Sequence, residues 1–246
     1  RQQQQLPPEV PRQHLLEQSG LSPAILAALA SKGIVEIFTR EINRFNYTGT
    51  EQGELPKLSA PQSEALDSIH RMFIDKNVTL LHGVTSSGKT EIYIHLIDYI
   101  LKKGSQALYL VPEIALTTQL TRRLQKVFGK RVIIYHSKFS DNERVDIWKR
   151  MLHDPSPCVV IGARSSLFLP FSRLGLVIVD EEHESSYKQF DPAPRYNARD
   201  CAIVLASMHG AKTLLGSATP AIETYYKALN GRYGLVTLSE RYEGCL

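Results

Sequence analysis

The chain has 246 residues, 43% of them hydrophobic and 22% charged, with a formal net charge of +4 at pH 7. This composition is ordinary for a folded protein of one large or two smaller domains, and no apolar run reaches the roughly 20 residues of a membrane-spanning helix. No signal peptide is visible, and the three cysteines (Cys158, Cys201 and Cys245) lack the paired spacing of a metal site. We therefore expect a cytoplasmic protein with free thiols and no membrane partner, and a basic charge that permits a nucleic-acid partner without requiring one.

Residues 1–45 have the pattern of a winged helix-turn-helix module, in whole or in part. A short helix over residues 14–19 ends at a glycine, and a second over residues 22–33 opens on the Ser-Pro pair typical of helix starts. Residues 34–38 then predict a strand. Two arginines that could touch phosphate follow, Arg40 and Arg44. The alternative is a small helical module whose charges are only solvated.

Residues 46–57 are rich in Gly, Glu and Thr and have no periodic pattern, which predicts a linker. From residue 58 to residue 246, short apolar runs alternate with amphipathic stretches. The apolar runs are residues 78–81, 107–111, 132–135, 159–161, 176–179 and 213–215. The helix-like stretches include residues 91–102, 117–128, 141–152 and 198–209. Fully apolar strands separated by helices indicate an α/β domain with a mostly parallel sheet covered on both faces.

Residues 83–90, Gly-Val-Thr-Ser-Ser-Gly-Lys-Thr, match the phosphate-binding loop pattern at every fixed position. The two glycines let the backbone curl, so that successive N–H groups can cradle phosphate oxygens, and the helix that follows adds its positive end. Lys89 adds a charge for the outer phosphates, and the Thr90 hydroxyl can ligate Mg²⁺. The predicted ATP-binding residues are Gly83, Val84, Thr85, Ser86, Ser87, Gly88, Lys89 and Thr90. A turn that binds nothing is the alternative.

An apolar strand that ends in acids should lie beside such a loop, and residues 176–183 supply one. We expect Asp180 to hold Mg²⁺ together with Thr90, and Glu181 to act as general base for the attacking water. Asp180, Glu181 and Lys89 form the predicted catalytic set for hydrolysis of a nucleoside triphosphate. The expected fold of residues 58–246 is therefore a RecA-like P-loop NTPase lobe.

The acidic turn Asp-Glu-Glu-His (residues 180–183) and the segment Gly-Ser-Ala-Thr-Pro (residues 216–220) resemble motifs II and III of superfamily 2, DEAH-type helicases. Longer matches extend the resemblance over nearly all of residues 58–224, to the PriA family of bacterial primosomal helicases. They include GVTSSGKTEIY, LYLVPEIALTTQL, VVIGARSSLFLPF, LVIVDEEHESSYKQ, RYNARD and GSATPAIET. The resemblance implies the first lobe of an ATP-dependent 3′→5′ DNA helicase for replication restart and primosome assembly at stalled forks. It also implies single-stranded and forked DNA, other primosome proteins and single-stranded DNA-binding protein as partners, and a bacterial, nucleoid-associated location.

The resemblance carries roles to individual residues. Gln62 matches the glutamine that reads the adenine edge, for which an amide can donate and accept at once. His183, Ser217 and Thr219 would couple the nucleotide site to movement along DNA. An aromatic-rich loop after residue 184 would stack on bases and pair with phosphates, so that hydrolysis waits for single-stranded DNA. The DNA-binding residues implied are Pro112, Thr117, Arg164, Tyr187, Lys188, Arg195, Tyr196 and Arg199. An ordinary loop with core aromatics is the alternative.

The sequence departs from the family pattern at three places. Ser86 replaces the first glycine of the usual Thr-Gly-Ser-Gly-Lys-Thr, which bears on nucleotide affinity. Asn197 stands where the family often has histidine, and residues 190–194 are about one residue longer than usual; both bear on the detail of the aromatic loop.

Because the sequence begins with Arg1 and nothing after residue 220 predicts a second lobe, we expect a fragment of a longer protein. The second lobe with its arginine, the zinc-binding cysteine clusters and the amino-terminal 3′-end-binding domain of the family are not in this sequence, so zinc is expected in the parent only. We expect this piece to bind ATP weakly, to hydrolyse it slowly and not to unwind DNA. Two alternatives stay open: another superfamily 2 translocase, and a DNA-binding module that uses nucleotide only as a switch.

Overall fold

The computed structural model describes residue 10 and residues 12–20, 22–37, 53–136 and 139–240. The chain divides into two compact units, residues 1–44 and residues 45–246, which we describe separately. None of the helices in the described ranges combines the length and the apolar character of a transmembrane span.

The first unit contains the two predicted helices, α1 (Arg12–Ser19) and α2 (Pro23–Ser31). The Ser22 side chain accepts a hydrogen bond from the backbone N–H of Ile25 (3.4 Å) and caps α2, as the Ser-Pro pair predicts. Gly20 and Gly33 follow the two helices with φ values of 64° and 69°, a left-handed conformation that glycine adopts at little cost.

The strand predicted over residues 34–38 is wrong for residues 34–37, which form a turn and irregular backbone. Ile34 and Ile37 are 66% and 51% exposed, so the apolar run does not pack on a neighbour. A strand needs a partner for its ladder, and the described part of this unit offers none. The winged helix is therefore not supported. Phe38, Arg40 and Arg44 lie outside the described residues.

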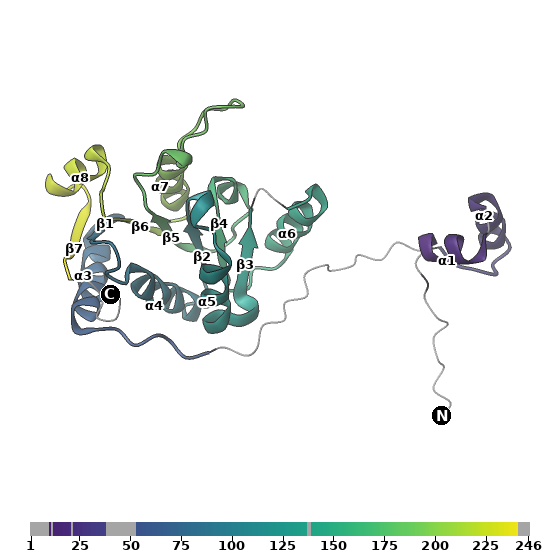
Figure 1. Cartoon of the computed structure of the whole chain (residues 1–246), viewed down its shortest axis with the longest axis horizontal. Coiled ribbons are helices and arrows are strands. Elements are labelled where there is room, and N and C mark those ends of the chain that lie inside the picture. Colours follow the sequence, from purple (N-terminus) through teal and green to yellow (C-terminus); the bar gives the residue numbers. More distant parts are fainter. Residues whose placement is uncertain (1–9, 11, 21, 38–52, 137–138, 241–246) are drawn as a thin grey trace. The chain divides into compact units, whose positions relative to one another are not determined.

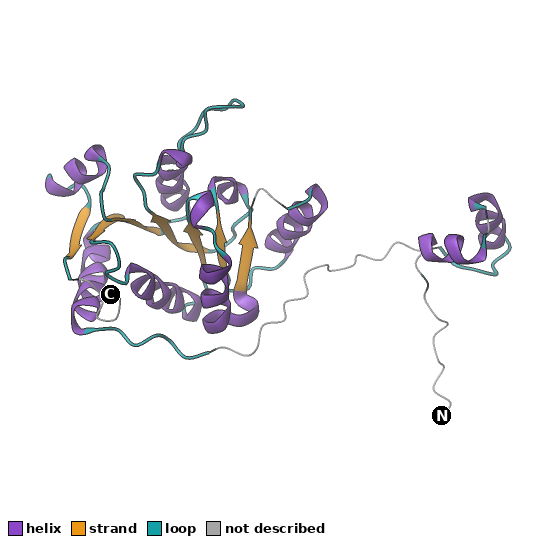
Figure 2. Ribbon diagram, in the orientation of Figure 1, coloured by secondary structure: helices purple, strands orange, loops and turns teal. Residues whose placement is uncertain are grey.

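The second unit is built on one seven-stranded sheet in the order β3-β4-β2-β5-β6-β1-β7, with every pair parallel (Figures 1 and 2). The strands are β1 (Val78–Gly83), β2 (Gln106–Leu110), β3 (Val132–Tyr135), β4 (Val159–Gly162), β5 (Leu174–Asp180), β6 (Lys212–Ser217) and β7 (Gly234–Leu238). All six predicted apolar runs are strands, and the sheet is fully rather than mostly parallel. The edge strand β7 is an addition to the predicted set.

Helices cover both faces of this sheet (Figure 1). One face carries α3 (Ala60–Asp75), α4 (Lys89–Lys102) and α5 (Thr118–Phe128), and the other carries α6 (Asp141–His153), α7 (Ala198–Met208) and α8 (Ile222–Leu229). Along β1, Leu80 packs with the second set and Leu81 with the first, because successive strand residues point to opposite faces. The predicted three-layer α/β fold is confirmed; α3 and α8 are additions to the predicted helices.

The last residues of the predicted linker belong to this lobe. The backbone N–H of Gly53 donates to Val127 O (3.1 Å), Leu55 packs against the core beside α3–α5, and Pro56 O lies 2.8 Å from His95 Nε2. The lobe thus begins by residue 53 rather than residue 58, while residues 46–52 lie outside the described ranges.

The strand register brings three loops together at the carboxyl edge of the sheet. Strand β6 lies between β1 and β5, with Ser217 opposite His82 and Gly216 opposite Asp180. The phosphate-loop segment, the acidic turn and the segment after β6 therefore emerge side by side. This is the edge at which ligands bind in open parallel sheets.

Candidate active site

The phosphate-loop segment runs from the end of β1 into α4. Ser86 and Gly88 have positive φ values of 62° and 78°, and α4 begins at Lys89. Ser86, which replaces the family's glycine, therefore holds a left-handed backbone that costs a residue with a Cβ about 1–2 kcal/mol. The Val84 N–H donates to Leu238 O at the end of β7 (3.1 Å), which corrects its assignment to the phosphate cradle: Val84 anchors the loop instead.

The remaining loop residues fit a bound phosphate chain. The Ser87 hydroxyl is buried and has no hydrogen-bond partner within the described structure. A Cβ added to Gly83 would lie 2.9 Å from that hydroxyl and 3.2 Å from the Lys89 side chain. The Lys89 ammonium folds back over the loop to Gly83 O (2.9 Å) and Val84 O (3.5 Å). An orphaned buried hydroxyl and an ammonium hydrogen-bonded to backbone carbonyls are groups that phosphate oxygens can satisfy.

Gln62 lies beside this loop, but its amide is already engaged. It is 1% exposed, and its Oε1 accepts from the Ser59 N–H (2.8 Å) in a capping box at the start of α3. Its Nε2 donates to Ser87 O (3.2 Å) and Gly88 O (3.4 Å). Reading an adenine edge requires the release of one of these contacts, so the adenine assignment stays a prediction.

Asp180 ends β5 as a half-buried carboxylate that accepts from three donors. Its Oδ1 accepts from the Tyr93 hydroxyl (3.0 Å) and the Glu181 N–H (3.1 Å), and its Oδ2 accepts from the Tyr109 hydroxyl (3.2 Å). Burial, and then the Glu181 charge, raises the pKa of Asp180 to about 6. Sequence reasoning missed both tyrosines. The available signal was a tyrosine in each of two elements expected to be buried, because a buried phenol needs a hydrogen-bond partner.

Glu181 is the accessible acid of the turn. Its φ of 45° is a strained conformation for a side-chain-bearing residue, and its side chain remains 35% exposed. One carboxylate oxygen lies 3.9 Å from Lys89 Nζ and the other 3.7 Å from His183 Nδ1. The three groups face the same small space, which is where a general base and a phosphate-binding cation must meet.

The acidic turn contacts the segment after β6 through the side chain of His183. His183 Nδ1 lies 2.8 Å from Ser217 Oγ, and its Nε2 lies 3.4 Å from Thr219 Oγ1. Ser217 Oγ also accepts from the Thr219 N–H (3.0 Å). The coupling role of the three residues stays a prediction.

The assignment of Arg199 to DNA is wrong. The residue is 7% exposed, and its guanidinium donates to Glu182 (3.1 Å), Asp200 (3.0 Å) and Glu223 (3.0 Å). The buried Glu182 carboxylate accepts from the Thr224 hydroxyl (2.9 Å) and the Ala221 N–H (2.7 Å) as well. The arginine is therefore fully used in tying α7 and α8 to the acidic turn.

Tyr187 is not a stacking platform either, because it is 1% exposed. Its hydroxyl donates to Asp180 O (2.6 Å) and Leu110 O (3.2 Å), so it joins the carboxyl ends of β5 and β2. Its ring packs with the core under α6–α8. The sequence pattern of the loop shows that an aromatic residue is present, but it does not show in which direction its side chain points.

The rest of the aromatic loop, between η4 (Ser185–Tyr187) and α7, projects away from the sheet (Figure 1). Three predicted cations brace it through carbonyls: Arg164 donates to Lys188 O (3.1 Å), Lys188 to Arg195 O (2.7 Å) and Arg195 to Phe190 O (2.7 Å). Arginine has five donors and lysine three, so each keeps donors for phosphate.

The exposed aromatic side chains here are largely ones that the site prediction did not assign. Phe190 is 67% exposed, and Phe168 of η3 (Arg164–Phe168) is 63% exposed. The partly exposed Tyr196 meets Phe168 edge to face, with ring centroids 5.3 Å apart. The phenylalanine of the SSLF segment carried no special signal in sequence.

The two residues predicted from motif Ia differ in access. Thr117 is exposed at the start of α5, where its hydroxyl caps the helix by accepting from the Leu120 N–H (3.2 Å). Pro112 is buried before η1 (Glu113–Ala115), which contradicts a side-chain contact with DNA.

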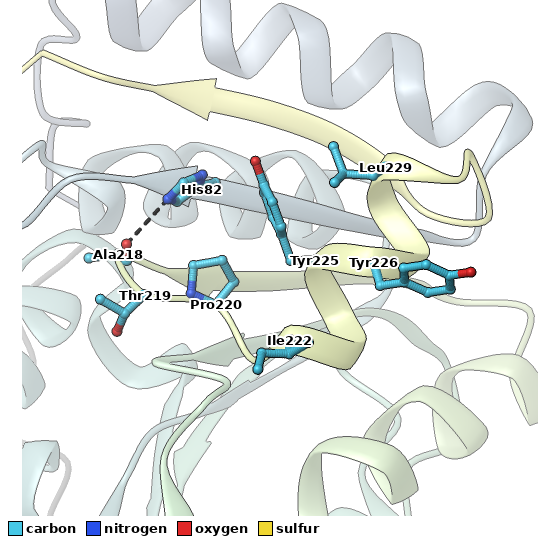
Figure 3. A pocket seen from close by; sticks show the side chains of 8 residues that line it. All are labelled: His82, Ala218, Thr219, Pro220, Ile222, Tyr225, Tyr226 and Leu229. Carbon is cyan, nitrogen blue, oxygen red and sulfur yellow. Dashed lines mark hydrogen bonds between the residues drawn. The ribbon is translucent and has the colours of Figure 1, made fainter.

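A pocket of about 500 Å³ adjoins the segment after β6 (Figure 3). The residues that line it are His82, Ala218, Thr219, Pro220, Ile222, Tyr225, Tyr226 and Leu229. His82 Nε2 lies 3.2 Å from Ala218 O, and its ring meets Tyr225 edge to face. Thr219 therefore contacts both the acidic turn and this largely apolar space.

Comparison with known proteins decides the family. A family model described as DEAD/DEAH box helicase matches residues 59–228, most of the chain. The chain belongs to the DEAD/DEAH box helicase family. Membership implies the use of ATP, typically with Mg²⁺, which agrees with the phosphate loop and the acidic turn. In this helicase chain both lie at one edge of a RecA-like sheet.

Curated relatives of this helicase chain carry the description "Replication restart protein PriA". The one from Bacillus subtilis is 41% identical over 95% of this chain and 29% of the relative. The one from Haemophilus influenzae is 43% identical over 89% of this chain and 31% of the relative. A solved structure of RecG bound to a three-way DNA junction matches with a TM-score of 0.56 and 25% identity, over 78% of this chain and 25% of that one. The chain thus spans less than a third of the length of these proteins.

Proposed function

We propose that this chain is the first motor lobe of a PriA-type replication-restart helicase, and that in the complete protein this lobe binds ATP and hydrolyses it in response to single-stranded DNA. The observation that carries the proposal is the meeting of Lys89, the orphaned Ser87 hydroxyl and the two acids, Asp180 and Glu181, at the ends of neighbouring strands. The similarity to PriA proteins over nearly the whole chain supports it.

Different residues of the phosphate loop bind different parts of the triphosphate. Its backbone N–H groups and the Ser87 hydroxyl hold phosphate oxygens, and Lys89 exchanges the Gly83 and Val84 carbonyls for the outer phosphates. Thr90 and Asp180 hold Mg²⁺, which when bound supplies positive charge to the phosphate oxygens. Gln62 turns one end of its amide to the adenine.

Glu181 acts as general base on the attacking water. It is partly exposed and lies within 4 Å of Lys89, so it stands next to the position of the outer phosphates. His183 fixes the other carboxylate oxygen, and through Ser217 and Thr219 it links Glu181 to the segment after β6. Movement of that segment can then alter the position of the base.

Single-stranded DNA is the proposed regulator of this step. Phe168, Phe190 and Tyr196 offer faces for bases, and Arg164, Lys188, Arg195 and the Thr117 hydroxyl offer donors for phosphates. The loop is anchored by Tyr187 on the Asp180 carbonyl and by Arg199 on Glu182, the two residues that flank Glu181. A strand seated on the loop therefore acts on the catalytic base through buried contacts.

The wider role is proposed from the similarity to PriA. The complete protein would pair this lobe with a second one that supplies an arginine to the ATP site. It would translocate 3′→5′, act at forked DNA with other primosome proteins and single-stranded DNA-binding protein, carry zinc outside this segment, and work at the nucleoid.

Glu181→Gln tests the catalytic assignment. We expect single-turnover ATP hydrolysis by this chain to fall by about 10²–10⁴-fold, because the base is lost, while nucleotide binding persists. Lys89→Ala should instead abolish binding, and Glu64→Gln, an exposed glutamate on α3, should change neither. Undiminished turnover by the Glu181→Gln variant, or a wild-type chain that binds no ATP, would refute the proposal.

A further inference from the structure

Two buried phenols from different elements meet on the carboxylate of Asp180. Tyr93 comes from α4 and Tyr109 from β2, both are fully buried, and their rings pack edge to face with centroids 5.5 Å apart. The Tyr93 hydroxyl donates to Asp180 Oδ1 (3.0 Å), and the Tyr109 hydroxyl donates to Asp180 Oδ2 (3.2 Å).

These contacts occupy most of the hydrogen-bond acceptor positions of the Asp180 carboxylate. Each oxygen can accept two hydrogen bonds. Oδ1 accepts from Tyr93 and from the Glu181 N–H, while Oδ2 accepts from Tyr109. One acceptor position is left, on Oδ2.

The neighbouring strand is shaped around the first phenol. Gly216 of β6 lies opposite Asp180, and a Cβ added there would lie 1.8 Å from the Tyr93 hydroxyl oxygen. The glycine that begins the Gly-Ser-Ala-Thr-Pro segment thus leaves the space in which Tyr93 reaches the carboxylate. Any side chain at this position would displace the phenol.

The second phenol connects β2 to the acidic turn, because the Tyr109 hydroxyl donates to Asp180 Oδ2 (3.2 Å). A change in the position of this phenol therefore changes the direction of the carboxylate oxygen that still has an acceptor position.

We propose that Tyr93 and Tyr109 are positioning residues of the magnesium site, which orient Asp180 so that a single acceptor on Oδ2 is presented to the metal. This rests on the proposed function of the loop as an ATP site. The role differs from simple compensation of a buried charge, because it requires the hydroxyls to set how well the metal binds. Groups that orient ligating carboxylates typically change metal affinity 10–100-fold when removed.

The test is a magnesium titration of nucleotide binding by this chain, followed with a fluorescent ATP analogue. Tyr93→Phe and Tyr109→Phe should each raise the half-saturating Mg²⁺ concentration by about 10-fold. Affinity for the analogue in excess EDTA should stay within about twofold of wild type, because the phosphate loop is intact. Tyr99→Phe is the matched control, since Tyr99 lies on α4 but is 43% exposed and pairs with His70 and Lys103 instead.

The outcomes separate this inference from the proposed function. Phe variants that titrate like wild type, in a chain that binds the analogue in a Mg²⁺-dependent way, overturn the positioning role and leave the ATP site standing. A wild-type chain that does not bind the analogue, or binds it equally after Lys89→Ala, overturns both.

If the Tyr109→Phe variant fails to fold, a second variant shows whether the lost hydrogen bond to Asp180 is the cause. If the phenol serves the Asp180 carboxylate, combining Tyr109→Phe with Asp180→Asn removes the unsatisfied charge and restores the thermal unfolding transition. A double variant that stays unfolded would assign Tyr109 to ring packing alone and overturn its part of the proposal.

Discussion

At Asp180, burial and hydrogen bonding act on the charge in opposite directions. Three donors favour the ionised carboxylate, but loss of water and the neighbouring Glu181 charge oppose it more strongly, and the pKa rises to about 6. The nucleotide-free site therefore holds a carboxylate that is costly to ionise. A cation next to it would remove that cost.

This predicts a pH dependence of stability in the absence of nucleotide and Mg²⁺. The folded-state pKa lies above the unfolded value near 4, so the folded state keeps its proton where the unfolded state has lost it. The contribution of Asp180 is complete below about pH 4 and is lost as pH rises through about 6, by roughly 3 kcal/mol. The unfolding free energy of wild type minus that of Asp180→Asn, from urea titrations, should fall by that amount between about pH 4 and pH 7. A pH-independent difference would contradict it.

Residue types in the site were predictable, and side-chain directions were not. The phosphate loop and the acidic turn follow apolar strands, so the sequence indicated which sheet edge they share. Tyr187 sits where no periodic pattern separates an inward from an outward side chain, and Arg199 is a charged residue in the first turn of a predicted helix; both proved buried. Tyr93 and Tyr109 are flanked by aliphatic residues in α4 and β2, and their meeting on Asp180 depends on a register that only the folded sheet defines.

At the scale of elements, Glu182 and Arg199 connect three pieces of chain. Glu182 belongs to the acidic turn, and Arg199 lies in the first turn of α7. The Ala221 N–H and the Thr224 hydroxyl, which donate to Glu182, lie at the start of α8. Both charged side chains are nearly inaccessible, with exposures of 0% for Glu182 and 9% for Arg199. Such a pair is costly to break from one side, because the remaining charge stays buried.

Arg199→Ala should therefore destabilise the lobe by about 3–5 kcal/mol in urea-induced unfolding. The matched control is Arg195→Ala, an exposed arginine in the loop that precedes α7, for which we expect a change within about 0.5 kcal/mol. Adding Glu182→Gln to Arg199→Ala should recover part of the loss, because it removes the stranded charge. Equal effects of the two arginine substitutions would show that the network contributes no more than a surface contact.

A strand could be predicted from the sequence where its burial in the fold leaves a continuous apolar run. The six predicted strands, which include the edge strand β3, read as continuous apolar runs because both of their faces are covered. Strand β7 lies at the edge with Thr237 exposed and Val236 buried, so its run is interrupted and escaped prediction. The strand proposed over residues 34–38 failed for the opposite reason, since an apolar run without a partner strand or packing surface carries no ladder.

At the scale of the whole molecule, a net charge of +4 is too small to identify a DNA surface, but its local distribution is informative. Lys188 and Arg195 lie on the projecting loop, Arg164 of η3 donates to that loop, and the exposed rings of Phe168 and Phe190 and the partly exposed ring of Tyr196 belong to the same two segments. Cations and aromatic faces bind single strands through different physics. Cations release condensed counterions, whereas stacking is nearly insensitive to salt.

That difference predicts two kinds of variant on one surface. Removing the charge of Arg195 should lower affinity for single-stranded DNA and reduce the slope of log K against log salt by about 0.7, the value for one phosphate contact on a single strand. Phe190→Ala should lower affinity by about 1–3 kcal/mol with the slope unchanged. Lys103→Ala, an exposed cation just beyond the carboxyl end of α4, is the control and should leave both quantities as they are. Binding measured by fluorescence anisotropy over a range of salt concentrations separates the two effects. If the Arg195 and Lys103 substitutions change the slope equally, the loop is not the nucleic-acid surface. The proposed connection from DNA through Tyr187 and Arg199 to Glu181 would then be wrong.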